Sequence, residues 1–498
     1  MTAHRQLLRQ AALGVAFVAA RSLIAQALAL AATVVLARSL SALDFGVLAA
    51  GLAITGFAST IGDVGLAAGL IRSQREPTSH QLRSALCLQL ATLTGLAVVA
   101  AGVAWNFGRI GPVTAVMAIS LPVLSFQTPA RVVLERALRY KRLASVEVVQ
   151  SATYSGCAVV AVVAGAGVWG VAVATVLQAA IGTLLLLGAT PEGRILPTWD
   201  ATEMKSLASF GLKFQAVNIA NLIRDHGLNV AVAAILGVAA LGSWNLASRI
   251  LQAPLTLFGA VWRVSYPAMA RLVRADARPR QVLERAVAAA SIAAGLILVP
   301  LGGSALLAVP LVFGSRWGTV AYTVAPACAA LLIGGPISIS VGGFLYARGA
   351  ARDVLIAVIA HTVAWFAVAI PLLPLIGVPA VGIGLIAGSS VDAVVLARAA
   401  RRAAGARVLR RLLGPCGGGL LIGGAVFGAS AFAHPTALTA SAAAFVAVVA
   451  FVALVEAAAR GRFAAFSAAP SVLFREALDL AMTRQRTVPA INFDAPAA

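Results

Sequence analysis

Long apolar runs dominate the chain, and short stretches rich in charge, glycine or proline separate them. Each run is about 20 residues or longer, which is the length a helix needs to cross the ~30 Å hydrocarbon core of a bilayer. The fourteen runs are 11–36, 45–70, 84–105, 112–133, 144–164, 167–188, 206–236, 241–266, 286–312, 320–345, 353–373, 377–397, 412–432 and 438–458. This pattern predicts an all-α integral membrane protein with about 14 transmembrane helices.

The charges between the runs alternate from one loop to the next. If the amino terminus is cytoplasmic, 30 of the 38 Lys and Arg residues fall on the cytoplasmic side, and the outside loops hold only Arg38, Arg109 and Arg316. Because cytoplasmic loops carry an excess of Lys and Arg, this asymmetry predicts that both termini are cytoplasmic. The net charge of +21 then reflects loops that face anionic lipid headgroups, and we expect no nucleic acid partner.

The predicted seventh span, 206–236, carries a broad polar face. Its polar side chains are Lys213, Asn218, Asn221, Arg224, Asp225, His226 and Asn229. A charge at the centre of the hydrocarbon costs ~3 to over 10 kcal/mol, so each charged group needs a protein or water partner. Two interpretations are open: a structural network that locks neighbouring helices together, or a binding path for an anion.

Two other spans carry polar residues of the same kind. Arg21 lies in the middle of the first span, so Arg21 and Arg224 would supply one cation from each half of the chain. In the eighth span, Asn245, Arg249, Gln252, Thr256 and Arg263 follow helical spacing on one side. The predicted substrate-binding residues are Arg21, Arg224, Arg249, Lys213, Asn221, Asn245 and Gln252. The alternatives are salt bridges alone for Arg21 and Arg224, and extension to the headgroups for Lys213.

Four titratable residues are candidates for carrying a coupling ion: Asp225, His226, Asp63 and His361. Asp225 would either carry H⁺ or Na⁺ or neutralise an arginine on another helix. A lone intramembrane histidine is more often a satisfied hydrogen-bonding group than a coupling site. Three other acidic residues, Glu147, Asp392 and Glu456, lie near the ends of predicted spans, where an interfacial role explains them.

The sequence excludes several classes of function. The outside loops are about ten residues or shorter, whereas a membrane glycosyltransferase or polymerase usually needs a substantial external loop for acid and base residues. The sequence has no Walker A loop, metal-ligand cluster or nucleophile elbow. We therefore predict a transporter without cofactor or metal, and not an enzyme.

A weak internal repeat divides the chain. Residues 39–51 and 235–247 each place a glycine near the start of an inward-going span, at an offset of 196 residues. Two six-helix lobes with a pathway between them would suit a transporter that rocks between two states. The expected domains are the lobes 1–188 and 189–397, two extra helices in 398–459, and a cytoplasmic tail, 460–498, with an interfacial helix or partly disordered segment at 470–486.

Three stretches carry a family resemblance: 36–74, which begins LARSLSALDFGVLAAG; the basic segment ERALRYKRLASVEVV at 135–149; and the pair 224–250 and 313–329. All three are similar to parts of the oligosaccharide flippases. The first stretch matches their first turn and second span, and the second matches the basic loop before their fifth span. The pair matches their seventh-to-eighth-span turn and the entry to their tenth span. Those flippases are the polysaccharide-transporter branch of the superfamily that also contains the MATE drug exporters and the lipid II flippase.

The resemblance implies a V-shaped bundle in the cytoplasmic membrane that moves lipid-linked oligosaccharide repeat units, carried on undecaprenyl pyrophosphate, to the outer leaflet. A doubly anionic diphosphate would need cations along a polar path, and arginine offers a bidentate fork for phosphate oxygens. The implied partners are this lipid-linked substrate and membrane lipids, with polysaccharide polymerase and export proteins, and H⁺ or Na⁺, as further candidates. The alternatives are a MATE-like drug exporter, a lipid II flippase, and a membrane scaffold for polysaccharide synthesis.

Overall fold

The computed structural model describes residues 24–63, 70, 77–137, 139–190, 195–205, 226–274 and 279–462. Regular secondary structure within these ranges is entirely helical, which confirms the all-α fold class. Ten helices are long and apolar enough to cross a membrane, and a pair bent by 46°, Ile110–Ser125 with Gln127–Arg136, raises this number to eleven. The chain is therefore a multi-pass membrane protein, and the count of fourteen spans stays a prediction.

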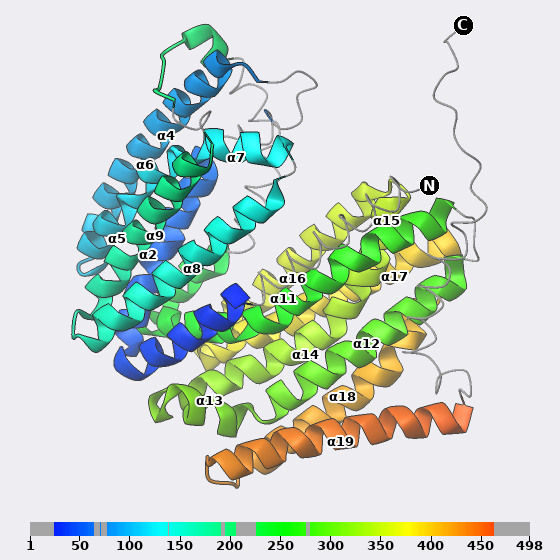
Figure 1. The fold of residues 1–498 in the computed structure, drawn as a ribbon. Coiled ribbons are helices and arrows are strands. Elements are labelled where there is room, and N and C mark those ends of the chain that lie inside the picture. Colours follow the sequence, from blue (N-terminus) through cyan, green and yellow to red (C-terminus); the bar gives the residue numbers. More distant parts are fainter. Residues whose placement is uncertain are drawn as a thin grey trace, which may run out of the picture.

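The helices form two bundles (Figure 1). The first bundle contains α2 (Ala42–Gly62), α4 (Ser79–Trp105), α5 (Ile110–Ala118), α6 (Ser120–Ser125), α7 (Gln127–Arg136), α8 (Tyr140–Val163) and α9 (Gly167–Ala189). The second contains α11 (Val238–Arg274), α12 (Pro279–Gly303), α13 (Ala305–Phe313), η2 (Ser315–Val320), α14 (Ala321–Ile337), η3 (Ser338–Gly342), α15 (Gly343–Ala347), α16 (Ala351–Ile376), α17 (Pro379–Ala404), α18 (Val408–Ser430) and α19 (Ala437–Arg462). Two shorter apolar helices, Ile24–Ser39 and His226–Leu236, lie within the predicted first and seventh spans.

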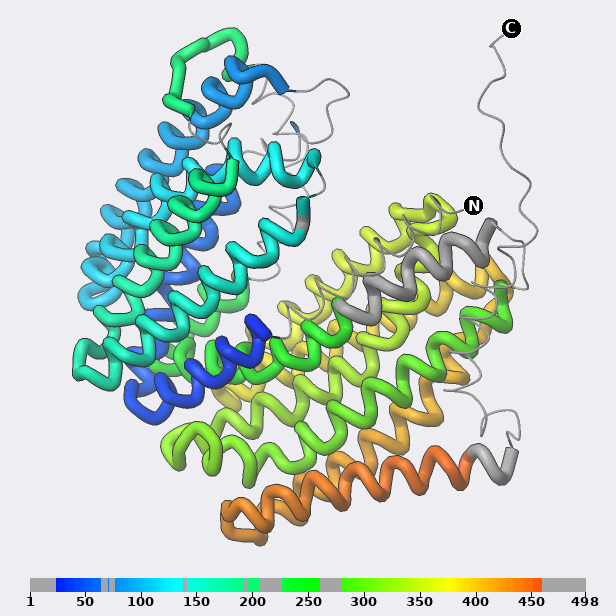
Figure 2. Tube along the Cα trace, viewed as in Figure 1, coloured from blue at the N-terminus to red at the C-terminus, as the bar shows by residue number. Residues whose placement is uncertain are grey.

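The two bundles meet where α2 packs against α11 and diverge toward their opposite ends, which produces the V shape seen in Figures 1 and 2. We call the end where α2 and α11 begin the converging end, and the opposite end the diverging end. The closest approach is at Gly46 and Gly242, because a Cβ atom on Gly46 would overlap the carbonyl of Val238 and one on Gly242 would overlap the carbonyl of Ala42. These two glycines are the pair related by the 196-residue repeat. The contact therefore has approximate two-fold symmetry.

The Ile24–Ser39 helix packs against the second bundle, although the sequence assigned it to the first lobe. Arg38 donates from Nε to the carbonyl of Val312 at 2.9 Å and from Nη2 to that of Leu311 at 2.8 Å. In return, Arg316 donates to the carbonyls of Leu40 and Arg38 itself, each at 3.1 Å. Arg38 thus satisfies carbonyls at the carboxyl end of α13, and Arg316 satisfies carbonyls at the carboxyl end of the Ile24–Ser39 helix. No intrahelical donor remains at either place. The predicted domain boundaries stay a prediction.

A buried tryptophan strengthens the same junction. Trp317, which is 1% exposed, donates from Nε1 to the carbonyl of Ala37 at 2.8 Å. Its ring meets that of Phe45 on α2 edge to face, with centroids 5.1 Å apart. Trp317 therefore contacts the Ile24–Ser39 helix and the first bundle at once.

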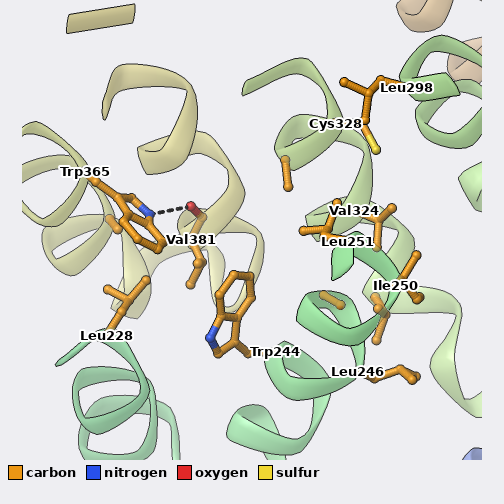
Figure 3. Close-up of a cluster of buried hydrophobic side chains, with 14 of the residues drawn as sticks. Leu228, Trp244, Leu246, Ile250, Leu251, Leu298, Val324, Cys328, Trp365 and Val381 are labelled. Atoms are coloured by element: carbon orange, nitrogen blue, oxygen red, sulfur yellow. Dashed lines mark hydrogen bonds between the residues drawn. The ribbon is translucent and has the colours of Figure 1, made fainter. Parts of the chain in front are cut away.

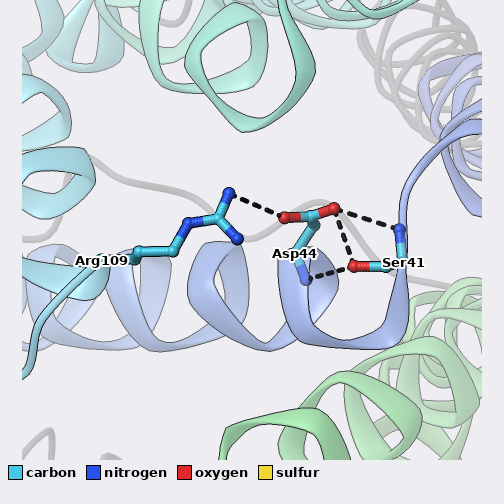
Figure 4. Close-up of polar contacts among 3 residues, drawn as sticks. All are labelled: Ser41, Asp44 and Arg109. Carbon is cyan, nitrogen blue, oxygen red and sulfur yellow. Dashed lines mark hydrogen bonds and ion pairs between the residues drawn. The ribbon is translucent and has the colours of Figure 1, made fainter.

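The start of α2 is held by a capping box (Figure 4). The Ser41 hydroxyl accepts from the backbone N–H of Asp44 at 3.1 Å, and the Asp44 carboxylate accepts from the backbone N–H of Ser41 at 3.2 Å. The second carboxylate oxygen of Asp44 accepts from Arg109 at 3.2 Å, which joins α2 to the turn before α5. All three arginines that the sequence placed in outside loops are thus engaged at the converging end.

The core of the second bundle is an apolar cluster in which α11, α12, α14, α16 and α17 meet (Figure 3). Trp365, 9% exposed, donates from Nε1 to the carbonyl of Val381 at 3.0 Å. Cys328 is 2% exposed and lies among Leu298 and Val324, where it packs as a small apolar side chain. This core gives α11 a rigid support from which to present its polar side chains.

Candidate functional site

The predicted site residues divide into two groups. Arg21, Lys213, Asn221, Arg224 and Asp225 lie outside the described residues, so their predicted roles stay predictions. The described members are Asn245, Arg249, Gln252, His226, Asp63 and His361. They lie in separate surroundings, and only the three on α11 share one face of a helix.

Arg249 lies on α11, and its guanidinium is held by neutral partners.

 It is the twelfth residue of α11, about three helical turns from the converging end. Arg249 donates from Nε to the Asn245 side-chain oxygen at 2.9 Å and from Nη1 to the Thr33 hydroxyl at 3.4 Å. Among the described residues, no carboxylate pairs with this guanidinium. Arg249 is therefore a half-buried cation in the predicted eighth span, and it lacks a neutralising partner in the described part of the chain.

A second polar contact continues the same seam between α11 and the Ile24–Ser39 helix. The Thr256 hydroxyl lies 3.5 Å from the side-chain oxygen of Gln26, and Gln252 is exposed between the two contacts. The pairings of Thr33 with Arg249 and of Gln26 with Thr256 show that the helices run antiparallel. We call this row the α11 polar seam; its side chains are Gln26, Thr33, Asn245, Arg249, Gln252 and Thr256.

The chemistry of the α11 polar seam suits a ligand with phosphate and hydroxyl groups. Amide and hydroxyl side chains both donate and accept hydrogen bonds, as sugar hydroxyls do. A guanidinium offers five donors in a planar fork, which matches phosphate oxygens. The helical spacing of Asn245, Arg249 and Gln252 had already indicated this face, but their pairing with the Ile24–Ser39 helix has no local sequence signal.

His226 lies in a neutral hydrogen-bonded group. Its Nδ1 is 3.4 Å from the side-chain nitrogen of Asn229, and the Asn229 side-chain oxygen accepts from Trp244 Nε1 at 2.8 Å. This arrangement favours the structural alternative for His226, because each partner described here is uncharged. Its role as a coupling residue stays a prediction.

Asp63 caps the carboxyl end of α2, inside the first bundle at its diverging end. Its carboxylate accepts from the Gln89 side chain on α4 at 3.3 Å, and Arg131 on α7 attracts it electrostatically. Arg131 in turn donates at 3.0 Å to Gln127, which is 1% exposed. Asp63 therefore belongs to a polar network far along the chain from the α11 polar seam.

The same network fixes the bend between α6 and α7. Gln127 is the first residue after the 46° bend, and its side-chain nitrogen donates to the carbonyl of Ala179 and to the hydroxyl of Thr183, both at 3.1 Å. Gln150 on α8 reaches the Gln127 oxygen at 3.5 Å. The Thr183 hydroxyl in turn donates to the carbonyl of Val123 at 3.1 Å, so a side chain replaces a backbone partner where the span is interrupted.

His361 lies on α16, with its ring edge to face against Trp365 at a centroid distance of 6.0 Å. The helix α17 approaches it closely, since a Cβ atom on Gly388 would lie 2.8 Å from the His361 carbonyl oxygen and 3.3 Å from its ring. This position is within the second bundle, and no described contact joins His361 to Arg249. Its coupling role stays a prediction.

The structure also corrects the interpretation of Asp392. The sequence placed Asp392 near the end of a span and explained it by an interfacial role, but Asp392 is only 7% exposed, and α17 continues beyond it to Ala404. Its carboxylate accepts from the Ser338 hydroxyl at 2.6 Å. Ser338 begins η3, a five-residue π-helix, which is a feature often found at functional positions. The lack of glycine and proline between Asp392 and the capping Gly405 was the sequence signal for the longer helix.

The fold defines a class of two-bundle helical membrane proteins. The solved structure of the lipid II flippase MurJ, in an inward closed conformation, is similar to 89% of this chain and 98% of that chain, with a TM-score of 0.69 and 10% identity. An inward-facing MATE family multidrug resistance transporter is similar to 76% of this chain and 98% of that chain, with a TM-score of 0.51 and 17% identity. At these identities the likeness concerns the fold alone.

The sequence assigns the chain more narrowly. It belongs to the family of polysaccharide biosynthesis proteins, which matches residues 35–322. A relative from Escherichia coli strain K12, the lipopolysaccharide biosynthesis protein WzxC, is 26% identical over 323 residues, covering 61% of this chain and 64% of that protein. The aligned part thus spans slightly less than two thirds of that relative. The resemblance to the polysaccharide-transporter branch is confirmed at the level of family.

Proposed function

We propose that this protein is a flippase that moves polyprenyl-pyrophosphate-linked oligosaccharide repeat units across the cytoplasmic membrane for surface polysaccharide synthesis. The observation that carries the proposal is Arg249, a cation in the predicted eighth span whose described partners, Asn245 and Thr33, are both neutral. An unneutralised guanidinium at this depth is costly unless an anion or water meets it. Membership of the polysaccharide biosynthesis family supports an anionic, sugar-bearing substrate.

The α11 polar seam would handle the two parts of the headgroup differently. Arg249 would bind diphosphate oxygens through its fork, and Asn245 and Gln252 would exchange hydrogen bonds with sugar hydroxyls. The polyprenyl chain would stay in the lipid, since its transfer into a polar path would forfeit ~0.8 kcal/mol per CH₂. Arg21, Lys213, Asn221 and Arg224 are proposed to extend the same path.

The arginine distribution supports the direction of transport. Helix ends at the diverging end carry Arg136, Arg142, Arg280, Arg285, Arg348, Arg352, Arg398, Arg401, Arg402, Arg407, Arg410 and Arg411. The converging end carries Arg38, Arg109 and Arg316. By the positive-inside rule the diverging end is cytoplasmic, so the V would receive substrate from the inner leaflet. Asp63, Asp225, His226 and His361 remain candidates for coupling this movement to H⁺ or Na⁺.

The test is the leaflet distribution of the lipid-linked oligosaccharide in a strain that lacks this protein. We expect the intermediate to accumulate where an impermeant sugar-modifying reagent cannot reach it, and surface polysaccharide to be lost. Wild-type protein should restore both. Arg249→Ala should lower the rate of restoration at least tenfold, and Arg249→Lys should be intermediate, because lysine keeps the charge without the fork. Arg407→Ala, an exposed arginine at the diverging end, is the matched control.

Two results would overturn the proposal. Unchanged intermediates and surface polysaccharide, in a strain shown to have no second flippase, would exclude a role in this pathway and direct attention to drug export or lipid II. Full restoration by Arg249→Ala at wild-type protein levels would instead favour a scaffold, since a scaffold needs no anion in its membrane interior.

A further inference from the structure

The last turns of α17 form one wall of an open surface pocket of about 450 Å³. The pocket is lined by Val395, Arg398, Arg401 and Arg402, so three of its four lining residues are arginines. They belong to a short segment, 398–411, that holds six arginines. This concentration of positive charge lies away from the α11 polar seam in the sequence and on a different helix.

Helical geometry explains why the three arginines share one pocket. At 100° per residue, Val395, Arg398, Arg401 and Arg402 fall within an arc of about 120°. The opposite arc contains Leu396, Ala399 and Ala400, which are 2%, 1% and 0% exposed. One face of the helix end is therefore packed into the second bundle, and the face with the arginines is free to meet a ligand.

Few protein charges oppose these arginines. Arg402 lies 3.7 Å from the carboxylate of Asp353, but its side chain remains 73% exposed. No carboxylate in the described ranges pairs with Arg398 or Arg401. The carboxyl-terminal dipole of α17 favours cations in its last turn, yet it provides only about half an elementary charge for three guanidinium groups. The pocket thus has an excess of positive charge.

The depth of the pocket in the bilayer indicates which anion is near. From Pro379, which opens α17, to residue 397 the helix has no basic residue, and this length of about 28 Å matches the ~30 Å hydrocarbon core. Arg398 therefore lies where the hydrocarbon ends and lipid phosphates begin. Val395, slightly less than one helical turn earlier, lies at the depth of the first carbons of the lipid chains.

We propose that this pocket binds the phosphate headgroup of an anionic membrane lipid in the cytoplasmic leaflet, and we name the site the α17 arginine pocket. The guanidinium groups of Arg398, Arg401 and Arg402 donate to the phosphate oxygens, and Val395 contacts the lipid beside its headgroup. The cytoplasmic side follows from the arginine distribution at the diverging end. The site does not depend on the flippase activity proposed above, and neither does its test.

The test is native mass spectrometry of the full-length protein, released from detergent in the presence of phosphatidylglycerol or phosphatidylcholine. Wild-type protein should retain phosphatidylglycerol in preference to phosphatidylcholine. The triple variant Arg398→Gln, Arg401→Gln, Arg402→Gln should lose affinity for phosphatidylglycerol by on the order of a hundredfold, since each arginine near a membrane surface contributes about fivefold. The triple lysine variant at the same positions should retain an intermediate affinity.

The matched control is Arg285→Gln, Arg407→Gln, Arg410→Gln, which removes three exposed arginines outside the pocket and changes the net charge equally. It should bind phosphatidylglycerol as wild type does. Equal losses in both triple variants would mean that binding follows overall charge, and would overturn the site. Displacement of the lipid by millimolar inorganic phosphate would also overturn it, by showing a site for a soluble anion. Size-exclusion chromatography before each measurement establishes that every variant is folded and monodisperse.

Discussion

Single buried polar side chains show how the bundles tolerate hydrogen-bonding groups in the membrane. Asp392 has a described partner in the Ser338 hydroxyl at 2.6 Å, where the π-helix η3 interrupts the regular pattern between α14 and α15. A buried acceptor that loses its donor keeps the full cost of desolvation, whereas a pair that keeps its hydrogen bond contributes modestly. The stability of this region should therefore depend on the pair rather than on the charge.

We predict that Ser338→Ala destabilises the protein by about 1–3 kcal/mol, because it leaves the buried Asp392 carboxyl without that donor. Asp392→Asn should cost less, since its side-chain oxygen still accepts from Ser338. The midpoint of thermal unfolding in detergent measures both changes. Ser441→Ala, an exposed serine on α19, is the control, and an equal loss in Ser338→Ala and Ser441→Ala would contradict the prediction.

The crossing of α2 and α11 is the element-level feature that joins the bundles. Gly46 and Gly242 allow each helix to contact the backbone carbonyls of the other, and their two-fold arrangement follows the internal repeat. Small residues at such crossings let helices approach closely, and the gain is van der Waals packing rather than burial from water. A methyl group on either glycine would have to push the helices apart.

We expect Gly46→Ala and Gly242→Ala each to destabilise the protein by about 1–3 kcal/mol, because the added Cβ atom overpacks the crossing. Gly56→Ala, also on α2, is the control, since a Cβ atom there has nothing within 4 Å and alanine favours the helix. Thermal unfolding in detergent compares the three. A loss at Gly56 as large as that at Gly46 would show that helix propensity, not contact, decides the outcome.

Arg38 and Arg316 give a second prediction for the elements of the converging end. Arg38→Ala frees the carbonyls of Leu311 and Val312, and should cost about 1–3 kcal/mol, as should Arg316→Ala on the opposing helix end. Arg109→Ala should cost less than about 1 kcal/mol, because its ion pair with Asp44 is exposed, with 63% of the arginine side chain accessible. Unfolding midpoints of the three variants check this order, which a dominant effect of Arg109→Ala would refute.

For the whole molecule, the central question is which parts move together if the V opens and closes. The Ile24–Ser39 helix is connected through the chain to α2, yet its described polar contacts reach α11, α13 and η2 of the second bundle. A rocking motion that opens the α2–α11 contact would therefore carry this helix with the second bundle. The short connection at Leu40 and Ser41 would absorb the change in direction.

Cross-linking tests this division. In a variant without the native cysteines, Arg38→Cys and Val312→Cys, which lie outside the α11 polar seam, joined by a short bifunctional thiol reagent should leave the proposed flippase activity largely unchanged, because both positions belong to one moving body. Ala42→Cys and Val238→Cys, on opposite sides of the crossing, should block activity when cross-linked and recover when a reducible linker is cleaved. Inhibition by the first pair would place the Ile24–Ser39 helix with the first bundle.

The amino-acid sequence predicted the helical class, most span positions, the charge difference between the two ends and the repeat that relates Gly46 to Gly242. These features are local or periodic: apolar length follows from the thickness of the bilayer, and loop charge follows from the side of the membrane on which a loop stays. The repeated glycines were visible because duplication preserves spacing. The helical face shared by Asn245, Arg249 and Gln252 was visible because the three residues follow the helical period.

Other features depend on contacts between distant segments. The pairing of Thr33 with Arg249, the reciprocal caps of Arg38 and Arg316, and the burial of Asp392 join residues that the helical period does not relate. In a membrane protein the lipid-facing and protein-facing sides of a helix are both apolar, so hydropathy does not reveal which side packs against a neighbour. Shape complementarity and hydrogen bonding between helices decide that, and they exist only once the chain is folded.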